Sequence, residues 1–217
     1  MHSEDVSMLA TSRHLSGDVV LLSMSKSFDD IEQIRAPLLQ DKAVERTNLF
    51  STLGVRATAG PHEAAAVLKL EPLDDFEARE LGLVQDQVAP SRVTGSEPRV
   101  AIGSLLAQEL DVRQGALLIV APKFSNGGAT GTPVTCRVAS LVHLGIAHSD
   151  KQLVIADIGY SSAFDFGPTG IELRLFDPDD RRSFARHLQK QLGPRYRAIP
   201  LEELVAPLLK SAEGAPH

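Results

Sequence analysis

Apolar runs separated by polar stretches follow one another along the chain, and their spacing predicts both strands and helices. A continuous apolar run behind Gly17 predicts a buried strand over 17–25. In the next segment, 27–41, apolar residues recur at helical spacing, which predicts a helix that Pro37 bends or ends. Segments 43–60 and 62–73 read as extended chain around a Gly-Pro turn, and the alternation in "VLKLEPL" predicts a half-exposed strand.

The middle of the chain contains one well-defined strand–helix–strand pattern. An acidic helix is expected over 74–84, followed by a Pro-, Ser- and Gly-rich loop over 85–99. "RVAIG" then predicts a strand, "SLLAQELDV" a short amphipathic helix, and "ALLIVAP" a strand buried on both faces after the turn at Gly115. Residues 116–146 are expected to form a hairpin with a long Gly-rich tip over 123–133.

The remaining segments complete an α+β fold. Further strands are predicted at 151–157, 169–177 and 195–200, with helices near 158–167, at 177–193 and at 201–210. We expect β-α-β units from both chain ends and an inserted β-rich subdomain that carries the hairpin. The expected subdomains are 17–84 with 150–205, which would be nearer the membrane, and 85–149.

Composition and charge narrow the class of protein. The chain has 217 residues, 43% hydrophobic and 23% charged, which is typical of a globular protein. Its formal net charge is −6 and no Lys/Arg-rich run occurs, which argues against nucleic-acid binding. No apolar run reaches the roughly 18 residues that span a bilayer.

Residues capable of chemistry have ordinary structural explanations. The single cysteine, Cys136, lies in an apolar run and is interpreted as a core residue. His143, His148 and Asp150 lack the spacing of zinc ligands and are expected in a solvated turn. The Gly-rich segment 123–133 lacks the Lys of a phosphate-binding loop. We therefore predict no catalytic residue, no cofactor and no metal.

Other candidate nucleophiles and acids have the same kind of explanation. "GYSSA" lacks the second glycine of a serine-nucleophile turn. The Asp pairs at 29–30, 74–75 and 179–180 stand near helix starts, where carboxylates favour the helix dipole. His187 is interpreted as a surface residue of the helix 177–193.

The segment 99–157 resembles a known pattern. "VAIGSLLAQELDVRQGALLIVAP" and the hairpin after it are similar to the large extracytoplasmic domains of MacB-type and lipoprotein-releasing (Lol-type) ABC permeases. The resemblance extends over about 17–205. The matching residues are Gly103, Leu106, Ala107, Leu110, Gly115, Pro122, Pro133 and Gly145.

The resemblance implies a function without catalysis. Residues 1–217 would be a single periplasmic domain inserted between two transmembrane helices of an inner-membrane permease. It would couple cytoplasmic ATP hydrolysis to export or lipoprotein release by mechanotransmission. The implied partners are the transmembrane helices of the same permease, a second permease subunit in a homo- or heterodimer, a cytoplasmic ATPase and a periplasmic partner protein.

Within the resemblance, the hairpin is the expected partner-binding region. The residues concerned are Lys123, Phe124, Ser125, Asn126, Thr130, Thr132 and Arg137. The strands beside the tip carry only one basic residue, Arg137, which departs from the lipoprotein-releasing permeases and leaves a general MacB-like exporter equally open.

Two other readings remain open. "LAQELDVRQGALLIV" also resembles the helix–Gly–strand units of small β-barrels, so the chain could be a stand-alone protein-binding module. That alternative predicts a closed barrel and distant chain ends, whereas the permease reading predicts two subdomains with the chain ends close together. An enzyme would need a pocket in which acids converge.

Overall fold

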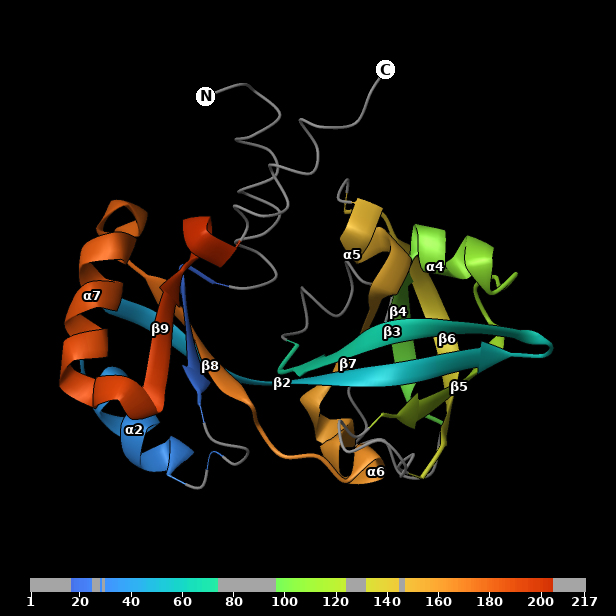
Figure 1. Ribbon diagram of the computed structural model, residues 1–217, viewed down its shortest axis with the longest axis horizontal. Helices are drawn as coiled ribbons and strands as arrows, with labels where there is room; N and C mark the ends of the chain where they lie inside the picture. The colour runs from blue at the N-terminus through green and yellow to red at the C-terminus, as the bar shows by residue number, and fades with distance from the viewer. Residues whose placement is uncertain are drawn as a thin grey trace, which may run out of the picture. The chain divides into compact units, whose positions relative to one another are not determined.

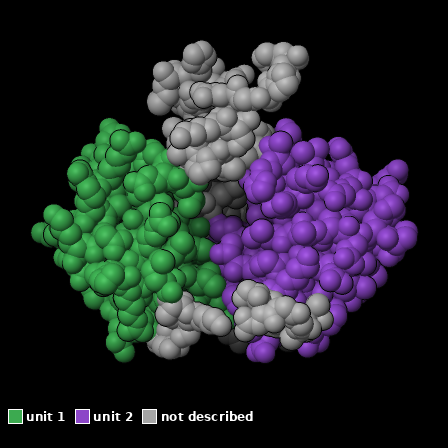
Figure 2. Space-filling model, viewed as in Figure 1, with its two compact units in different colours: residues 1–50, 167–217 green, residues 51–166 purple. Residues whose placement is uncertain are grey.

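The computed structural model describes residues 17–24, 28, 30–73, 97–123, 132–144 and 147–204. Helices and strands are mixed along the chain, which confirms the predicted α+β class (Figure 1). The chain divides into two compact units (Figure 2): unit 1 comprises residues 1–50 and 167–217, and unit 2 comprises residues 51–166. Unit 2 is therefore an insertion within the sequence of unit 1.

Unit 1 is built on an antiparallel sheet with the order β2-β8-β1-β9. Its strands are β1 (Val19–Ser23), the first part of β2 (Val44–Ala59), β8 (Gly170–Leu175) and β9 (Tyr196–Pro200). The helices α2 (Ile31–Leu38) and α7 (Arg181–Leu192) share an apolar core with one face of this sheet. Val19 and Leu21 enter that core because alternate residues of a strand face the same side.

The helix predicted over 177–193 forms as η2 (Pro178–Asp180) followed directly by α7. Asp177 Oδ1 accepts a hydrogen bond from the Asp179 amide at 3.0 Å, which satisfies a donor that has no partner within the helix. Gly193 ends α7 with a φ of +70°, a conformation that glycine adopts without strain. The short η3 (Gly193–Arg195) then leads into β9.

A polar cluster links the start of α2 to the start of β9. The Tyr196 hydroxyl donates to Asp30 Oδ2, and Arg195 Nη1 lies 3.2 Å from the same oxygen. The Tyr196 ring is buried and packs against Phe28 with 5.5 Å between ring centroids. The hydrogen bond from Tyr196 is the largest cause that lowers the pKa of Asp30 below its ordinary value of 3.8.

Unit 2 contains a closed six-stranded barrel. Its strands are the second part of β2, then β3 (His62–Glu71), β4 (Arg99–Gly103), β5 (Leu117–Pro122), β6 (Val134–Val142) and β7 (Leu153–Asp157). The order is β3-β7-β4-β6-β5-β2, and β2 pairs again with β3 to close the ring. The β3–β7 and β4–β6 pairs are parallel, and the other pairs are antiparallel.

The barrel interior is aliphatic. Its buried residues include Val55, Leu68, Ile102, Leu118 and Val154, one from each of five strands. Because a barrel of this size is filled by its own side chains, it holds a packed core and not a channel.

Short helices lie between the barrel strands or follow them along the chain. They are α4 (Ser104–Glu109), α5 (Ala147–Gln152), η1 (Ile158–Tyr160) and α6 (Ser161–Phe164). Leu106 and Ala107 of α4 and Phe164 of α6 belong to the same apolar core as the barrel strands.

The strand–helix–Gly–strand pattern predicted over 99–122 is confirmed as β4, α4 and β5. Gly115 makes the turn into β5 with a φ of +87°. β4 and β5 are not neighbours, because β6 lies between them. Gly103 has a specific steric role: a Cβ atom there would lie 2.2 Å from the backbone oxygen of Asp150 in α5.

Three expectations about exposure were wrong. The strand 116–122 is not buried on both faces, since Leu117 and Ile119 are 48% and 44% exposed on the outer side of the barrel. Lys69 and Glu71, expected on the exposed face of a strand, are buried and form an ion pair at 2.6 Å, which offsets the cost of removing each charge from water. His148 and Asp150 lie in α5 and not in a solvated turn, and Asp150 is buried.

The two units also divide at other positions than the expected 17–84 with 150–205 and 85–149. Residues 51–71 and 153–157 belong to unit 2 because they supply β2, β3 and β7 of the barrel. The expected helix at 74–84 and most of the loop 85–99 lie outside the described residues.

Substituting Gly103 with Ala tests the close contact between β4 and α5. The added methyl group collides with backbone, which cannot rotate away, so we expect a loss of about 2–4 kcal/mol in the free energy of unfolding. Urea denaturation measures it. Gly54→Ala is the matched control, because a Cβ at Gly54 meets nothing within 4 Å. Equal stability of the two variants would contradict the contact.

Substituting Tyr196 with Phe tests the cluster around Asp30. A carboxyl whose pKa is lowered by folding stabilises the protein above its unfolded pKa, and this contribution is lost as pH falls through the folded pKa. The wild type should therefore lose stability as pH falls below 3.8, the ordinary value of Asp30. Tyr196→Phe should be less stable at neutral pH and lose less on acidification. Urea midpoints between about pH 5 and pH 3 give the comparison; parallel curves for the two proteins would refute it.

Candidate functional site

The chain enters and leaves the sheet of unit 1 on neighbouring strands. β1 and β9 pair antiparallel over their whole length, from Val19 opposite Pro200 to Ser23 opposite Tyr196. Residues 17–18 precede β1 and residues 201–204, which are helical, follow β9. Both segments therefore meet the sheet at the same end.

Asp18 joins these two segments to β8. Its side chain is completely buried, and its Oδ2 accepts a hydrogen bond from the Leu175 amide at 2.9 Å. Its backbone amide donates to the Leu173 oxygen at 2.8 Å, and its backbone oxygen accepts from the Leu201 amide at 3.0 Å. One residue thus holds the incoming segment, the end of β8 and the outgoing segment.

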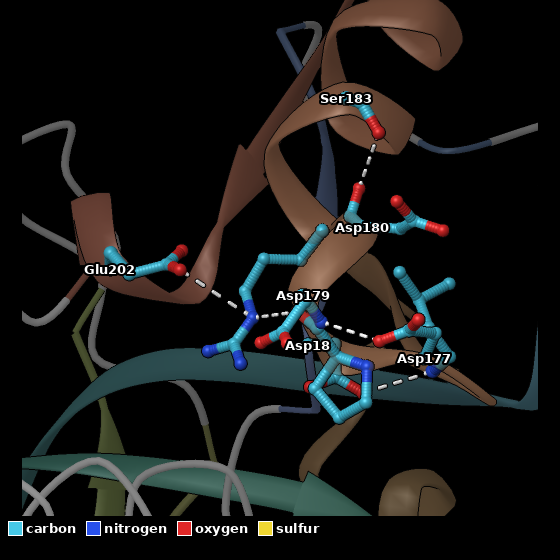
Figure 3. A network of polar contacts seen from close by, with 9 residues as sticks. Asp18, Asp177, Asp179, Asp180, Ser183 and Glu202 are labelled. Atoms are coloured by element: carbon cyan, nitrogen blue, oxygen red, sulfur yellow. Dashed lines mark hydrogen bonds and ion pairs between the residues drawn. The ribbon is translucent and has the colours of Figure 1, made fainter.

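Arg181 and Glu202 form a second link at this end of the sheet. Figure 3 shows Glu202 and the residues of the turn before α7 from close by. Arg181 Nε donates to the Pro178 oxygen and lies 3.5 Å from Glu202 Oε1. Their side chains are only 15% and 28% exposed, so water weakens the ion pair less than on an open surface. The link connects the outgoing segment to the first turn of α7.

We refer to Asp18, Arg181 and Glu202 together as the clasp. The sequence did not predict the role of these residues. Arg181 and Glu202 lie in charged segments, and their positions near helix ends already account for their charges. One signal was present: Asp18 is a charged residue placed directly against a continuous apolar strand. A charge in such a position is either solvated or paired with backbone donors.

The hairpin residues expected to bind a partner separate into two groups. Lys123 follows β5 and Thr132 precedes β6, and both side chains are exposed. They lie beyond the last β5–β6 pair, Val120 opposite Val134. Arg137 lies at the other end of this pairing, opposite Leu117. Phe124, Ser125, Asn126 and Thr130 lie outside the described residues.

Arg137 has structural partners of its own. Its Nη2 donates to Glu97 Oε2 at 2.7 Å and its Nη1 donates to the Gly115 oxygen at 3.0 Å. The side chain therefore ties β6 to the turn before β5. Beside it, Leu117 and Ile119 present apolar surface on the outer side of the barrel.

His143, Asp150 and Ser104 come together, although not as a catalytic triad. Nδ1 of His143 lies 2.9 Å from Asp150 Oδ2 and 3.2 Å from Ser104 Oγ. A general base needs the carboxylate and the nucleophile on different ring nitrogens. Asp150 Oδ1 accepts from the Leu144 amide at 2.7 Å, so this carboxylate stabilises the connection from β6 to α5.

Two kinds of site are absent from the described ranges. Within them, no three His, Cys, Asp or Glu side chains are grouped so that they could hold a metal ion. Also within them, no helix has both the length and the apolar character needed to cross a bilayer.

Comparison with known proteins places the fold. No protein-family model matches the chain, and no curated protein matches it. The periplasmic region of MacB from Actinobacillus actinomycetemcomitans superposes with a TM-score of 0.51 at 12% identity, covering 97% of this chain and 99% of that one. The chain therefore has a MacB-like periplasmic-domain fold, as the sequence pattern predicted.

A second solved structure is similar at a lower score. It is the extracellular domain of the noncanonic ABC-type transporter YknZ from Gram-positive bacteria, with a TM-score of 0.49 and 13% identity. The match covers 83% of this chain and 98% of that chain.

Cys136 provides a direct test of the barrel core. Its side chain is fully buried on β6, as predicted, and burial raises the pKa of its thiol from 9.0 to about 12. The reactive thiolate is therefore scarce at pH 8. We expect no reaction with Ellman's reagent at pH 8 until denaturant is added, and then one thiol per chain. Rapid labelling of the native protein would contradict a packed barrel.

Proposed function

We propose that this chain is the extracytoplasmic domain of an ABC transporter permease and that it has no catalytic role. It couples ATP hydrolysis on the cytoplasmic side to events outside the inner membrane, such as export of a substrate or release of a lipoprotein. The observation that carries the proposal is the pairing of β1 with β9, which brings the incoming and outgoing chain to one end of unit 1.

This arrangement suits a domain inserted between two transmembrane helices. Neighbouring strands lie about 5 Å apart, and packed helices have axes about 8–10 Å apart. Two transmembrane helices, one before residue 17 and one after residue 204, would therefore begin close to each other. In this proposal the transmembrane helices of the same permease, a second permease subunit and a cytoplasmic ATPase are the partners.

Unit 2 is the part we assign to contacts with a periplasmic partner protein. Its hairpin residues Lys123 and Thr132 are exposed at one end of the barrel, and the same proposal extends to Phe124, Ser125, Asn126, Thr130 and Arg137. The MacB-like fold supports an exporter in general, and lipoprotein release stays one case within it.

A stand-alone binding module is the second candidate function, and one observation favours it. It predicted a closed barrel, and unit 2 forms one. It also predicted distant chain ends, which lie outside the described residues. The described segments nearest to them are joined, because the Leu201 amide donates to the Asp18 oxygen at 3.0 Å. This contact supports the permease proposal, in which both segments continue toward the membrane.

The parent gene gives the decisive test. We expect it to encode one apolar run of about 20 residues before this chain and three after it. A topology reporter fused after each run should then place this chain outside the cytoplasmic membrane. A gene that encodes only this chain, or a reporter that places it in the cytoplasm, would overturn the permease proposal.

A further inference from the structure

We propose that the clasp transmits displacement of the segments 17–18 and 201–204 to unit 1 as a whole, and that it prevents β9 from separating from β1. This inference rests on the proposed function for its biological meaning. Its physical content concerns only the described residues of unit 1 and can be tested on the chain by itself.

The pairing of β1 and β9 alone is mechanically weak in the relevant direction. The two strands are antiparallel, and the segments that continue from them leave at the same end. A displacement that separates these segments loads the hydrogen bonds of the pair one after another, starting from Val19 and Pro200. Each bond adds only modestly to the stability of the folded state, because water replaces it when it breaks, so sequential loading opens the pair easily.

The clasp lies where this opening would begin. The Leu201 amide donates to the Asp18 oxygen immediately beyond the last strand pair. Asp18 is itself held from the opposite side, because its Oδ2 accepts from Leu175 and its amide donates to Leu173. A displacement of the outgoing segment is therefore carried across β1 to β8.

Arg181 carries part of the same displacement to a helix. Glu202, in the outgoing segment, lies 3.5 Å from Arg181 Nε, and Arg181 also donates to the Pro178 oxygen. The turn before α7 is itself braced by Asp177 Oδ1 on the Asp179 amide and by Ser183 Oγ on the Asp180 oxygen (Figure 3). Ala185 and Leu188 of α7 pack in the core of unit 1, so the helix and the sheet move together.

The test measures local opening in the full 217-residue chain by amide hydrogen exchange. Arg181→Met keeps the aliphatic stem and removes the charge and the donors. We expect exchange at the Leu201 amide to rise about tenfold, the effect of losing a partly buried ion pair with its hydrogen bond. Exchange at Leu21, in the middle of β1, should not change. Glu202→Gln should give the same pattern, more weakly.

Two neighbouring residues provide matched controls. Arg182→Met and Glu203→Gln remove the same charges from exposed side chains and should leave Leu201 exchange unchanged. Pulling on the chain by its two termini supplies the mechanical readout, where Arg181→Met should lower the force at which unit 1 opens and Arg182→Met should not.

Two results would overturn the inference. One is unchanged Leu201 exchange and opening force in Arg181→Met. The other is an equal rise in exchange at Leu201 and Leu21, which would mean that Arg181 contributes only to global stability. Either result leaves the permease proposal intact, because that proposal is judged from the parent gene. If the clasp is found and the gene encodes no membrane segments, the proposed function fails and the mechanical property remains.

Discussion

Unit 1 depends on the buried carboxylate of Asp18. A charged group removed from water is costly unless donors replace its hydration, and Asp18 is completely buried. The Leu175 amide donates to its Oδ2, at the point where β8 extends beyond its pairing with β1. The same residue uses its own amide and carbonyl for the β8 and outgoing segments. Gly17 precedes it with a φ of +66°, and a Cβ there would also lie 2.8 Å from the Leu173 oxygen.

Unit 2 depends on a different constraint, the closure of its strand ring. The long hairpin of β2 and β3, with nine paired residues from Ser51 to Ala59, supplies the last of the six strand contacts. Without it the remaining strands would form an open sheet with two unpaired edges. A closed barrel has one inner face, so buried and exposed positions alternate along β5. Leu118 and Val120 are buried, whereas Leu117 and Ile119 are exposed.

Local features of both units could be predicted from the sequence. The apolar run after Asp18, the turn at Gly60 and the acids before α7 each depend on neighbouring residues, and the strands and helix appear where they indicate. Pairings between distant segments could not be predicted. β3 pairs with β7 in parallel, from Val67 opposite Leu153 onwards, and no local pattern in either strand specifies that contact.

The clasp was unpredictable for the same physical reason. Asp18 and Leu175 are 157 positions apart, and nothing around either residue indicates the other. Of the hairpin residues chosen from the resemblance, Lys123 and Thr132 lie at one end of the β5–β6 pair and Arg137 lies at the other. A sequence pattern identifies a segment, whereas the strand register decides which of its residues share a surface.

The β-α-β segment of unit 2 has a structural role that follows from these constraints. The β4-α4-β5 segment supplies Ile102, Leu106 and Leu118 to a filled core, and Gly103 lets α5 approach the strand directly. Such a barrel resists deformation, because close-packed interiors transmit strain instead of absorbing it. Under the proposed function, a domain that passes on a displacement needs this rigidity and a firm connection at the segments 17–18 and 201–204. Unit 2 provides the first within itself, and Asp18 with Arg181 and Glu202 provides the second within unit 1.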